Sequence, residues 1–333
     1  HHDPVLADAV PFIFKYYDRD WGLCCSKTFY DSLKDEKYIV EIDSSDENGD
    51  LVVGEYFIQG KTDQEIVLMG HLCHPGQFND NASGCIAGMA IMEELQSRQK
   101  DLHYSYRLLI VPETIGSVAW LSENMNKVPN MIAGVFLEML AVKERPVSFQ
   151  YSYFGDGPLD TIGTLILESH LQNTIYGEYR EIVGNDERQF NSPGIRVPMV
   201  SFSRANPSFG KRVKHFNEYH THFDTVENAD MDLFFESMDC VWKMISALES
   251  DFYVHNKFCG EIFLSGLKPE LREYMGQVGW EPLLRFIDDL DGRLKISELA
   301  LEHGFSFEYV ETVVKGLQEA DLVELKREGA LNE

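Results

Sequence analysis

The fold is decided by residues 65–96, which read EIVLMGHLCHPGQFNDNASGCIAGMAIMEELQ. The segment opens with a short apolar run at residues 66–69, the pattern of a strand buried on both faces. A loop rich in turn-forming residues follows. Residues 83–96 then place apolar side chains at helical spacing. The segment therefore predicts a strand, a loop and a helix, in that order.

The same pattern of a strand-like run followed by a helical stretch recurs further along the chain. Residues 106–111 form a continuous apolar run and precede a helical stretch at 117–124, and further strand-like runs lie at 131–137 and 197–202. Alternating strands and helices predict an α/β fold with a mostly parallel sheet flanked by helices. In such sheets, functional sites gather at the carboxyl ends of the strands.

The two ends of the chain do not follow this alternation of strands and helices. Residues 10–60 combine aromatic side chains with turn signals and short apolar runs, which predicts a small β-rich insertion. Near the C-terminus, four short helical stretches precede a final strand-like run, a pattern that suggests a winged helix. We therefore expect one domain over residues 1–255, with the insertion inside it, and a winged-helix-like domain over residues 256–333.

The charge composition argues against some classes of binding partner. The 333 residues carry 29 Lys and Arg against 55 Asp and Glu, a net charge of −26. Such a surface repels phosphate backbones and anionic membranes, so neither nucleic acid nor a membrane is expected as a partner. Residues 261–333 contain 8 basic and 16 acidic residues, which argues against a DNA-reading wing. Self-association into a homo-oligomer stays open.

The sequence offers no targeting signal that we recognise. No apolar run reaches the length of a transmembrane helix, and the N-terminus lacks the layout of a signal peptide, so a cytoplasmic location is expected. Whether a further segment precedes this sequence is left open. Six cysteines without a paired zinc spacing are expected to be reduced thiols.

Five short segments place histidine or carboxylate side chains after strand-like runs or in turn-rich loops. They centre on His71, Asp80, Glu113, Glu138 and His220. Imidazole and carboxylate donors together suit zinc, and a carboxylate can bridge two ions. Each segment alone has a simpler interpretation, since a single histidine is more often structural and the Asp80 loop has the composition of an ordinary helix start. Their order along an α/β chain favours a metal site.

This ordered set resembles the zinc aminopeptidases of the co-catalytic zinc exopeptidase superfamily, and most closely a bacterial branch with a C-terminal winged helix. The resemblance covers nearly the whole chain. It implies that Asp80 bridges two zinc ions, that His71 and Glu138 complete one site, and that His220 belongs to the other. It also implies amide hydrolysis without a protein nucleophile, with two ions about 3.5–4 Å apart.

Two positions depart from the family's pattern. Cys73 stands where the family has an aspartate that orients the first histidine, and His74 is left open as its substitute or as a ligand. The family also has two consecutive glutamates, a general base and then a ligand, whereas Thr114 follows Glu113 here. The spacing to Gly116 favours Glu113 as the base. The ligand role stays open, and so does a site with a single ion.

Residues 185–190 are similar to the family's loop on the substrate side. We expect Asp186 or Glu187 to receive the α-ammonium group of a substrate, and Arg188 or Arg204 to hold a carboxylate or oxyanion. The function predicted first is a zinc aminopeptidase acting on peptides. The alternatives are a hydrolase or acyl-transfer enzyme for a small amino-sugar or natural-product amide, and an inactive enzyme-like binding or regulatory protein.

Overall fold

The computed structural model describes residues 1–330 except 14, 16–18 and 212. It groups the chain into two compact units, each of which is described by itself. The first unit comprises His1–Gly157 and Asn173–Asp239, and the second comprises Pro158–Gln172 and Cys240–Glu333. The predicted boundary at residues 255 and 256 stays a prediction.

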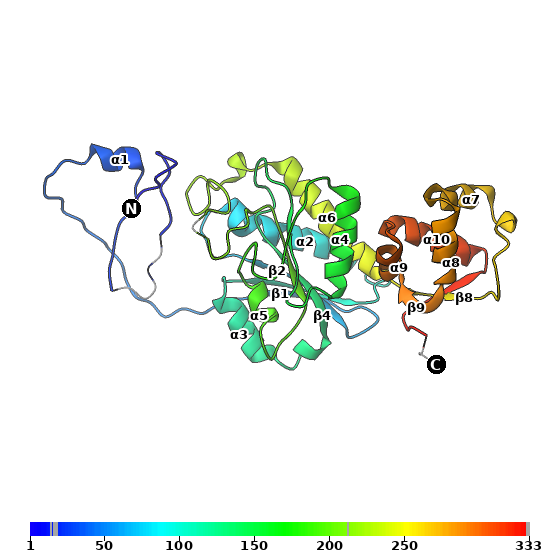
Figure 1. Cartoon of the computed structure of the whole chain (residues 1–333). Helices are drawn as coiled ribbons and strands as arrows, with labels where there is room; N and C mark the ends of the chain where they lie inside the picture. The colour runs from blue at the N-terminus through cyan, green and yellow to red at the C-terminus, as the bar shows by residue number, and fades with distance from the viewer. Residues whose placement is uncertain (14, 16–18, 212, 331–333) are drawn as a thin grey trace. The chain divides into compact units, whose positions relative to one another are not determined.

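The first unit is built on a seven-stranded sheet with the order β1-β3-β2-β4-β7-β5-β6 (Figure 1). Its four central strands, β3, β2, β4 and β7, run parallel, whereas β1 pairs with β3 and β5 pairs with β7 in antiparallel fashion. The predicted mixed α/β fold with a mostly parallel sheet is therefore confirmed. The strands are β1 (Gly54–Ile58), β2 (Glu65–His71), β3 (Ser105–Val111), β4 (Met131–Leu137), β5 (Ser148–Gln150), β6 (Ile175–Gly177) and β7 (Met199–Ser203).

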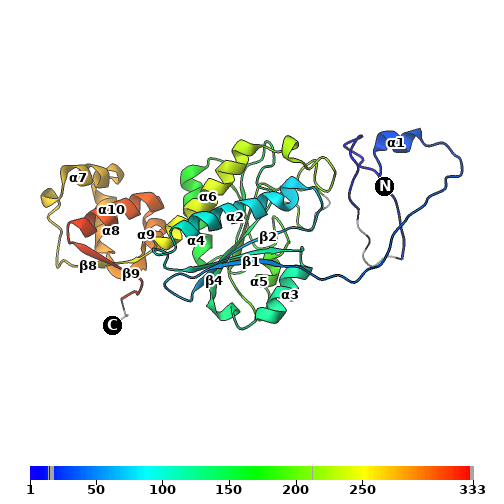
Figure 2. The ribbon, with the colours of Figure 1, turned by 180° about the vertical axis from the view of Figure 1, so that it is seen from behind.

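Helices cover both faces of this sheet. In Figures 1 and 2, α2 (Ser83–Ser97) lies over one face, and α3 (Ile115–Asn124) and α5 (Glu187–Phe190) lie over the other. A core cluster joins α3 and α5 to the strands, and in it the rings of Trp120 and Phe190 stack with centroids 6.3 Å apart. Because β2 and β4 are buried on both faces, their interior residues are continuously apolar rather than alternating.

Residues 10–60 differ from the expected β-rich unit. The described residues of this range contain helix α1 (Lys27–Ser32) and strand β1, and β1 pairs with β3 in the central sheet. Pro11 also forms an isolated bridge with Thr221. The apolar run at residues 38–42 is exposed, with Ile39 99% accessible. The local β pattern there has no strand partner among the described residues, so the prediction of a β-rich insertion is wrong.

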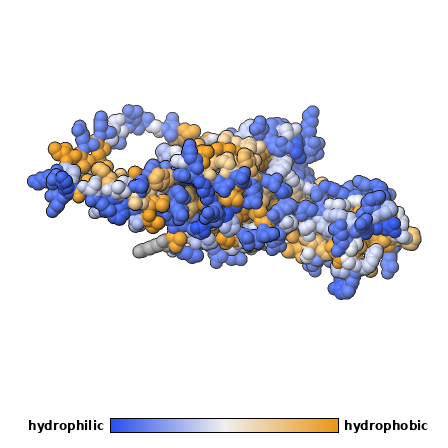
Figure 3. Space-filling view, turned by 90° about the horizontal axis from the view of Figure 1, so that it is seen from above, coloured by the Kyte–Doolittle hydropathy of each residue, from blue (hydrophilic) through white to orange (hydrophobic). Residues whose placement is uncertain are grey.

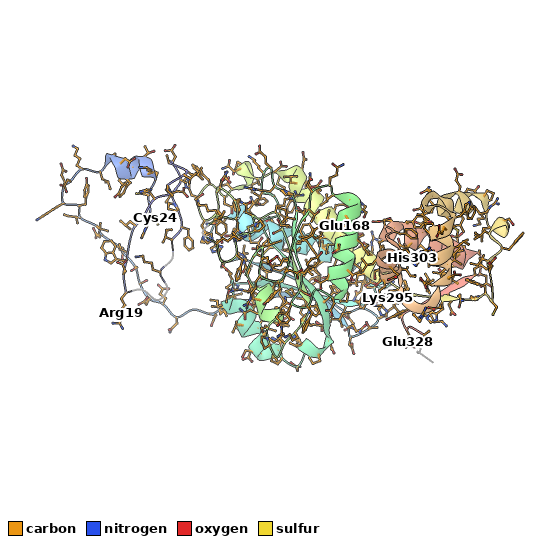
Figure 4. All side chains as sticks on the ribbon, in the orientation of Figure 1. Arg19, Cys24, Glu168, Lys295, His303 and Glu328 are labelled. Atoms are coloured by element: carbon orange, nitrogen blue, oxygen red, sulfur yellow. The ribbon has the colours of Figure 1, made fainter. Side chains whose placement is uncertain are left out.

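The second unit combines helices with a three-stranded antiparallel sheet of order β10-β8-β9. Gly304 ends α9 in the left-handed conformation at φ 66°, and the Ser306 hydroxyl accepts from the Tyr309 amide to start α10. His303, labelled in Figure 4, lies 3.0 Å from Asp289. The assignment of residues 256–333 as a winged-helix-like domain stays a prediction. The elements are α4 (Pro158–His170), α7 (Pro269–Met275), α8 (Trp280–Asp288), α9 (Ile296–His303), α10 (Phe307–Glu319), β8 (Tyr253–Asn256), β9 (Asp291–Lys295) and β10 (Val323–Lys326).

On the face that Figure 3 shows, hydrophilic side chains surround smaller hydrophobic clusters. Helix α6 (Met231–Glu249) is the longest of the described helices at 19 residues. Among the described residues, no helix combines the length and the apolar character that crossing a membrane requires.

Candidate metal centre

Three of the predicted site residues lie where parallel strands end. His71 is the last residue of β2, Glu113 follows β3 by two positions, and Glu138 follows β4 directly. Because β2 pairs in parallel with both β3 and β4, these three positions come to one edge of the sheet. His71 and Glu138 are fully buried, whereas the Glu113 side chain is 36% exposed.

Asp80 reaches the same edge from the loop between β2 and α2. The loop is held from a distant part of the chain, because the Asp224 carboxylate accepts from the amides of Asn79 and Asp80, each at 2.9 Å. The Asn79 side-chain oxygen in turn accepts from the Ala141 amide at 3.0 Å. These bonds place Asp80 independently of its own side chain.

The rest of the Asn-Asp-Asn-Ala-Ser-Gly motif ties the loop to the end of β4. The Asn81 amide group donates to the Leu137 carbonyl at 2.7 Å and its oxygen accepts from the Gly84 amide at 3.0 Å. A Cβ atom at Gly84 would lie 2.0 Å from the Leu137 oxygen, so this close approach requires glycine. The motif is therefore more than a generic turn and helix start.

The two oxygens of Asp80 face different imidazoles. Oδ1 lies 3.2 Å from His71 Nε2, whereas Oδ2 lies 3.0 Å from His220 Nε2 and 3.5 Å from His74 Nδ1. Ligand atoms of one tetrahedral zinc ion, at about 2.0–2.1 Å from it, are separated by roughly 3.3 Å. The observed distances therefore fit donors that share a cation on each side of the carboxylate.

Several of these buried atoms lack an ordinary hydrogen bond. Within the described part of the chain, His71 Nε2, His74 Nδ1, Asp80 Oδ2 and Glu138 Oε1 have no hydrogen-bond partner. Leaving buried polar atoms unsatisfied costs free energy, which a bound cation would offset. The cluster of His74, Asp80 and His220 could hold a metal ion, as could a neighbouring one of His71, Cys73, His74 and Glu113.

The electrostatics of the cluster are those of a buried ionic site. Burial raises the pKa of Asp80, but His220, His71 and His74 outweigh it and hold that pKa well below the usual range. Burial lowers the pKa of His71, yet Asp80 and Cys73 raise it well above the ordinary histidine value. Burial raises the pKa of Glu138 well above its usual value, although the nearby charge of His71 lowers it. A cation would stabilise both carboxylates in the ionised form.

Cys73 and His74 occupy separate places around the cluster. Cys73 Sγ lies 3.8 Å from His71 Nδ1, the ring nitrogen that faces away from Asp80. Cys73 therefore contacts the side of the His71 ring opposite Asp80. His74 presents Nδ1 to Asp80 and Nε2 to Glu113, whose Oε2 lies 3.8 Å away.

Comparisons with known proteins agree with this architecture. The family described as "Domain of unknown function (DUF4910)" matches residues 9–251. The chain belongs to the DUF4910 family. A Clostridium acetobutylicum protein called "Putative polysaccharide biosynthesis protein with aminopeptidase-like domain" is 31% identical over 340 residues, which cover 98% of this chain and 73% of that protein.

Solved structures are similar to the chain to different degrees. A crystal structure of a "putative peptidase" from Clostridium acetobutylicum superposes on this DUF4910 chain with a TM-score of 0.84 at 31% identity, covering 98% of this chain and 72% of that one. A zinc aminopeptidase from Bacillus subtilis aligns with a TM-score of 0.47 at 16% identity, over 58% of this chain and 48% of that one.

The acidic residues predicted on the substrate side of the DUF4910 site are buried. Asp186 accepts from the Thr114 amide at 2.8 Å and from the Ser117 hydroxyl, and burial raises its pKa to about 6. Glu187 accepts from the Asn185 amide at 2.9 Å, and burial raises its pKa to about 7. The Asp186 contacts hold the loop that carries Glu113, whereas the Glu187 contact stays within its own loop. Neither set of contacts supports binding of an α-ammonium group.

The two arginines also make structural contacts. Arg204 is 2% exposed and donates to the Ser237 hydroxyl, the Arg145 carbonyl and Glu236. Half-buried Arg188 donates to the Asn185 carbonyl at 2.9 Å. Neither arrangement directs a guanidinium group to Asp80, so the proposed contacts of these arginines with a substrate stay predictions.

Other residues of the site escaped the sequence analysis. Asn185 donates through Nδ2 to Glu138 Oε2 at 3.1 Å and so orients that carboxylate. The Phe12 amide donates to the His220 carbonyl at 2.7 Å, and the Phe12 ring lies 5.6 Å from His74 and 5.7 Å from His220. Asn185 could have been suspected from its place beside Asp186. Phe12 lies more than 200 residues before His220, and no local signal marks it.

Proposed function

We propose that this DUF4910 protein is a zinc-dependent hydrolase of peptide or amide bonds, in the first instance an aminopeptidase. The observation that carries the proposal is Asp80, a buried carboxylate whose two oxygens face imidazoles on different sides. Such a group stabilises a fold poorly without a cation. Its position at the carboxyl ends of parallel strands is the usual place for an active site in this architecture.

The metal would be held by His71, Asp80, Glu138 and His220. The donors are nitrogen and carboxylate oxygen, which suit zinc better than the all-oxygen sets preferred by magnesium or calcium. Bound zinc supplies Lewis-acid chemistry that polarises the carbonyl oxygen of the scissile amide. Asp80, with one oxygen on each side, supports two ions rather than one.

Glu113 is the general base in this proposal. Its carboxylate takes a proton from the water that attacks the amide carbon, and delivers it to the leaving nitrogen as the C–N bond breaks. Unlike the buried ligands, Glu113 is partly exposed and can reach water and substrate. The Asp186 contact with the Thr114 amide fixes the backbone next to it.

The substrate class is supported from two sides. The net charge of −26 favours a neutral or cationic substrate, such as a peptide with a free amine, over a polyanion. The name of the Clostridium acetobutylicum relative, which refers to polysaccharide biosynthesis, favours a second candidate, an amide on a small amino sugar. An inactive binding protein would keep the fold and show no turnover with either class.

Metal analysis combined with a substrate screen tests the proposal. We expect purified protein reconstituted with zinc to hold one or two ions per chain and to hydrolyse aminoacyl amides. Blocking the substrate's amine by acetylation should abolish turnover by an aminopeptidase, whereas N-acyl amino sugars should be cleaved under the second candidate. Zinc binding without turnover of either class would favour the binding protein. Failure to bind any divalent metal would end the proposal.

A further inference from the structure

We propose that His74 is a metal ligand, which completes with Asp80 and His220 the second metal position of this protein. The inference rests on the proposed function and deepens it. It assigns to His74 the ligand role that the second of two consecutive glutamates has in typical zinc aminopeptidases. That glutamate is replaced here by Thr114.

Thr114 itself cannot take over this role. Its backbone lies at φ 62° and its amide donates to Asp186, so the residue is fixed by the loop that holds Glu113. A threonine hydroxyl is also a much weaker zinc donor than a carboxylate or an imidazole. The second position therefore needs a donor from elsewhere in the fold.

His74 supplies this donor from the loop that follows β2. Pro75 and Gly76, the latter at φ 74°, turn the chain directly after it. The His74 ring then lies 4.9 Å from the His220 ring, and its Nδ1 lies 3.5 Å from Asp80 Oδ2. The His74 side chain is only 8% exposed, and its buried Nδ1 has no hydrogen-bond partner in the described part of the chain.

With His74 included, the two positions become equivalent in number of protein ligands. One would be held by His71, Asp80 and Glu138, and the other by His74, Asp80 and His220. The ligand atoms of His74, Asp80 and His220 all lie within 4.8 Å of one another. Three protein ligands with an open fourth position are typical of catalytic zinc. Glu113 is then free to act as the base.

A competing arrangement would use His71, Cys73, His74 and Glu113. It requires His71 to bind through Nδ1, next to Cys73, although its Nε2 already faces Asp80. One neutral imidazole offers a single acceptor nitrogen, so His71 cannot serve both sides. The arrangement with Asp80 uses the nitrogen that is buried and without a hydrogen bond, and we therefore prefer it.

The test is the number of zinc ions retained by single variants of the full chain after dialysis against buffered zinc. We expect His74→Ala and His74→Gln to lose the same ion as His220→Ala, taking a two-ion protein to one. Cys73→Ser and Glu113→Gln should keep the full complement. His222→Ala is the matched control, because His222 accepts from the Val10 amide outside the cluster. Circular dichroism checks that each variant is folded.

The outcomes separate the inference from the proposed function. Unchanged zinc content and affinity in both folded His74 variants would overturn the inference while leaving the proposed function intact. Loss of zinc in Cys73→Ser and Glu113→Gln together with His74→Ala would establish the competing arrangement instead. If the unmodified chain holds one ion, its loss in His74→Ala supports the ligand role and its retention refutes it. No zinc in the unmodified chain would end both.

Discussion

At the scale of single residues, a substitution at Glu113 distinguishes a role in proton transfer from a role in metal binding. Its carboxylate is partly exposed and lies 3.8 Å from His74 Nε2, whereas the proposed ligands lie around Asp80. We expect Glu113→Gln to keep its zinc and to lose amide hydrolysis by about 10²–10⁴-fold, the usual contribution of a general base. Zinc content and turnover are measured on the same preparation, with Glu123→Gln on the exposed face of α3 as control. A parallel fall of zinc and activity would make Glu113 a ligand.

At the scale of elements, the loop between β2 and α2 depends on Asp224. Its carboxylate accepts hydrogen bonds from the backbone amides of Asn79 and Asp80. An asparagine would offer one acceptor oxygen and would turn its NH₂ group toward the other amide. Asp224→Asn should therefore cost roughly 1–3 kcal/mol of stability, lower Tm and weaken zinc binding. Thermal unfolding and zinc titration test this, with exposed Asp63→Asn as control. Wild-type zinc affinity in Asp224→Asn would show that Asp80 is positioned by other contacts.

At the scale of the whole molecule, charge decides which partners are excluded. The net charge is −26, and residues 261–333 alone carry −8. Binding to duplex DNA depends on Lys and Arg that neutralise phosphates, so we expect no useful affinity even at low salt. Fluorescence anisotropy with a labelled duplex at 50 and 200 mM salt measures this, with a basic DNA-binding protein as positive control. Submicromolar binding that weakens steeply with salt would contradict it.

The sequence by itself located the central strands β2, β3, β4 and β7 and the order of the candidate ligands along the chain. Strands buried on both faces are mostly apolar, so β2 and β4 could be located closely, and so could β3 although it carries the buried Arg107. Two of the candidate ligands, His71 and Glu138, lie at the ends of these strands, and the parallel arrangement brings them to one edge. The β structure predicted around residues 38–42 was wrong because a segment with a β pattern forms a strand only where the edge of another strand is available to pair with it.

Only the tertiary structure decided which nitrogen or oxygen faces which neighbour. Asp224 is 144 residues from the loop it holds, and no local pattern reveals such a contact. The sequence left His74 open as a substitute for the orienting aspartate or as a ligand, and in the structure His74 Nδ1 faces Asp80 while Cys73 lies beside the far nitrogen of His71. Arg204 has the chemistry of an anion-binding residue, yet its buried hydrogen bonds use it inside the fold. Side-chain direction and long-range hydrogen bonds depend on how the whole chain packs, which residue type and spacing do not encode locally.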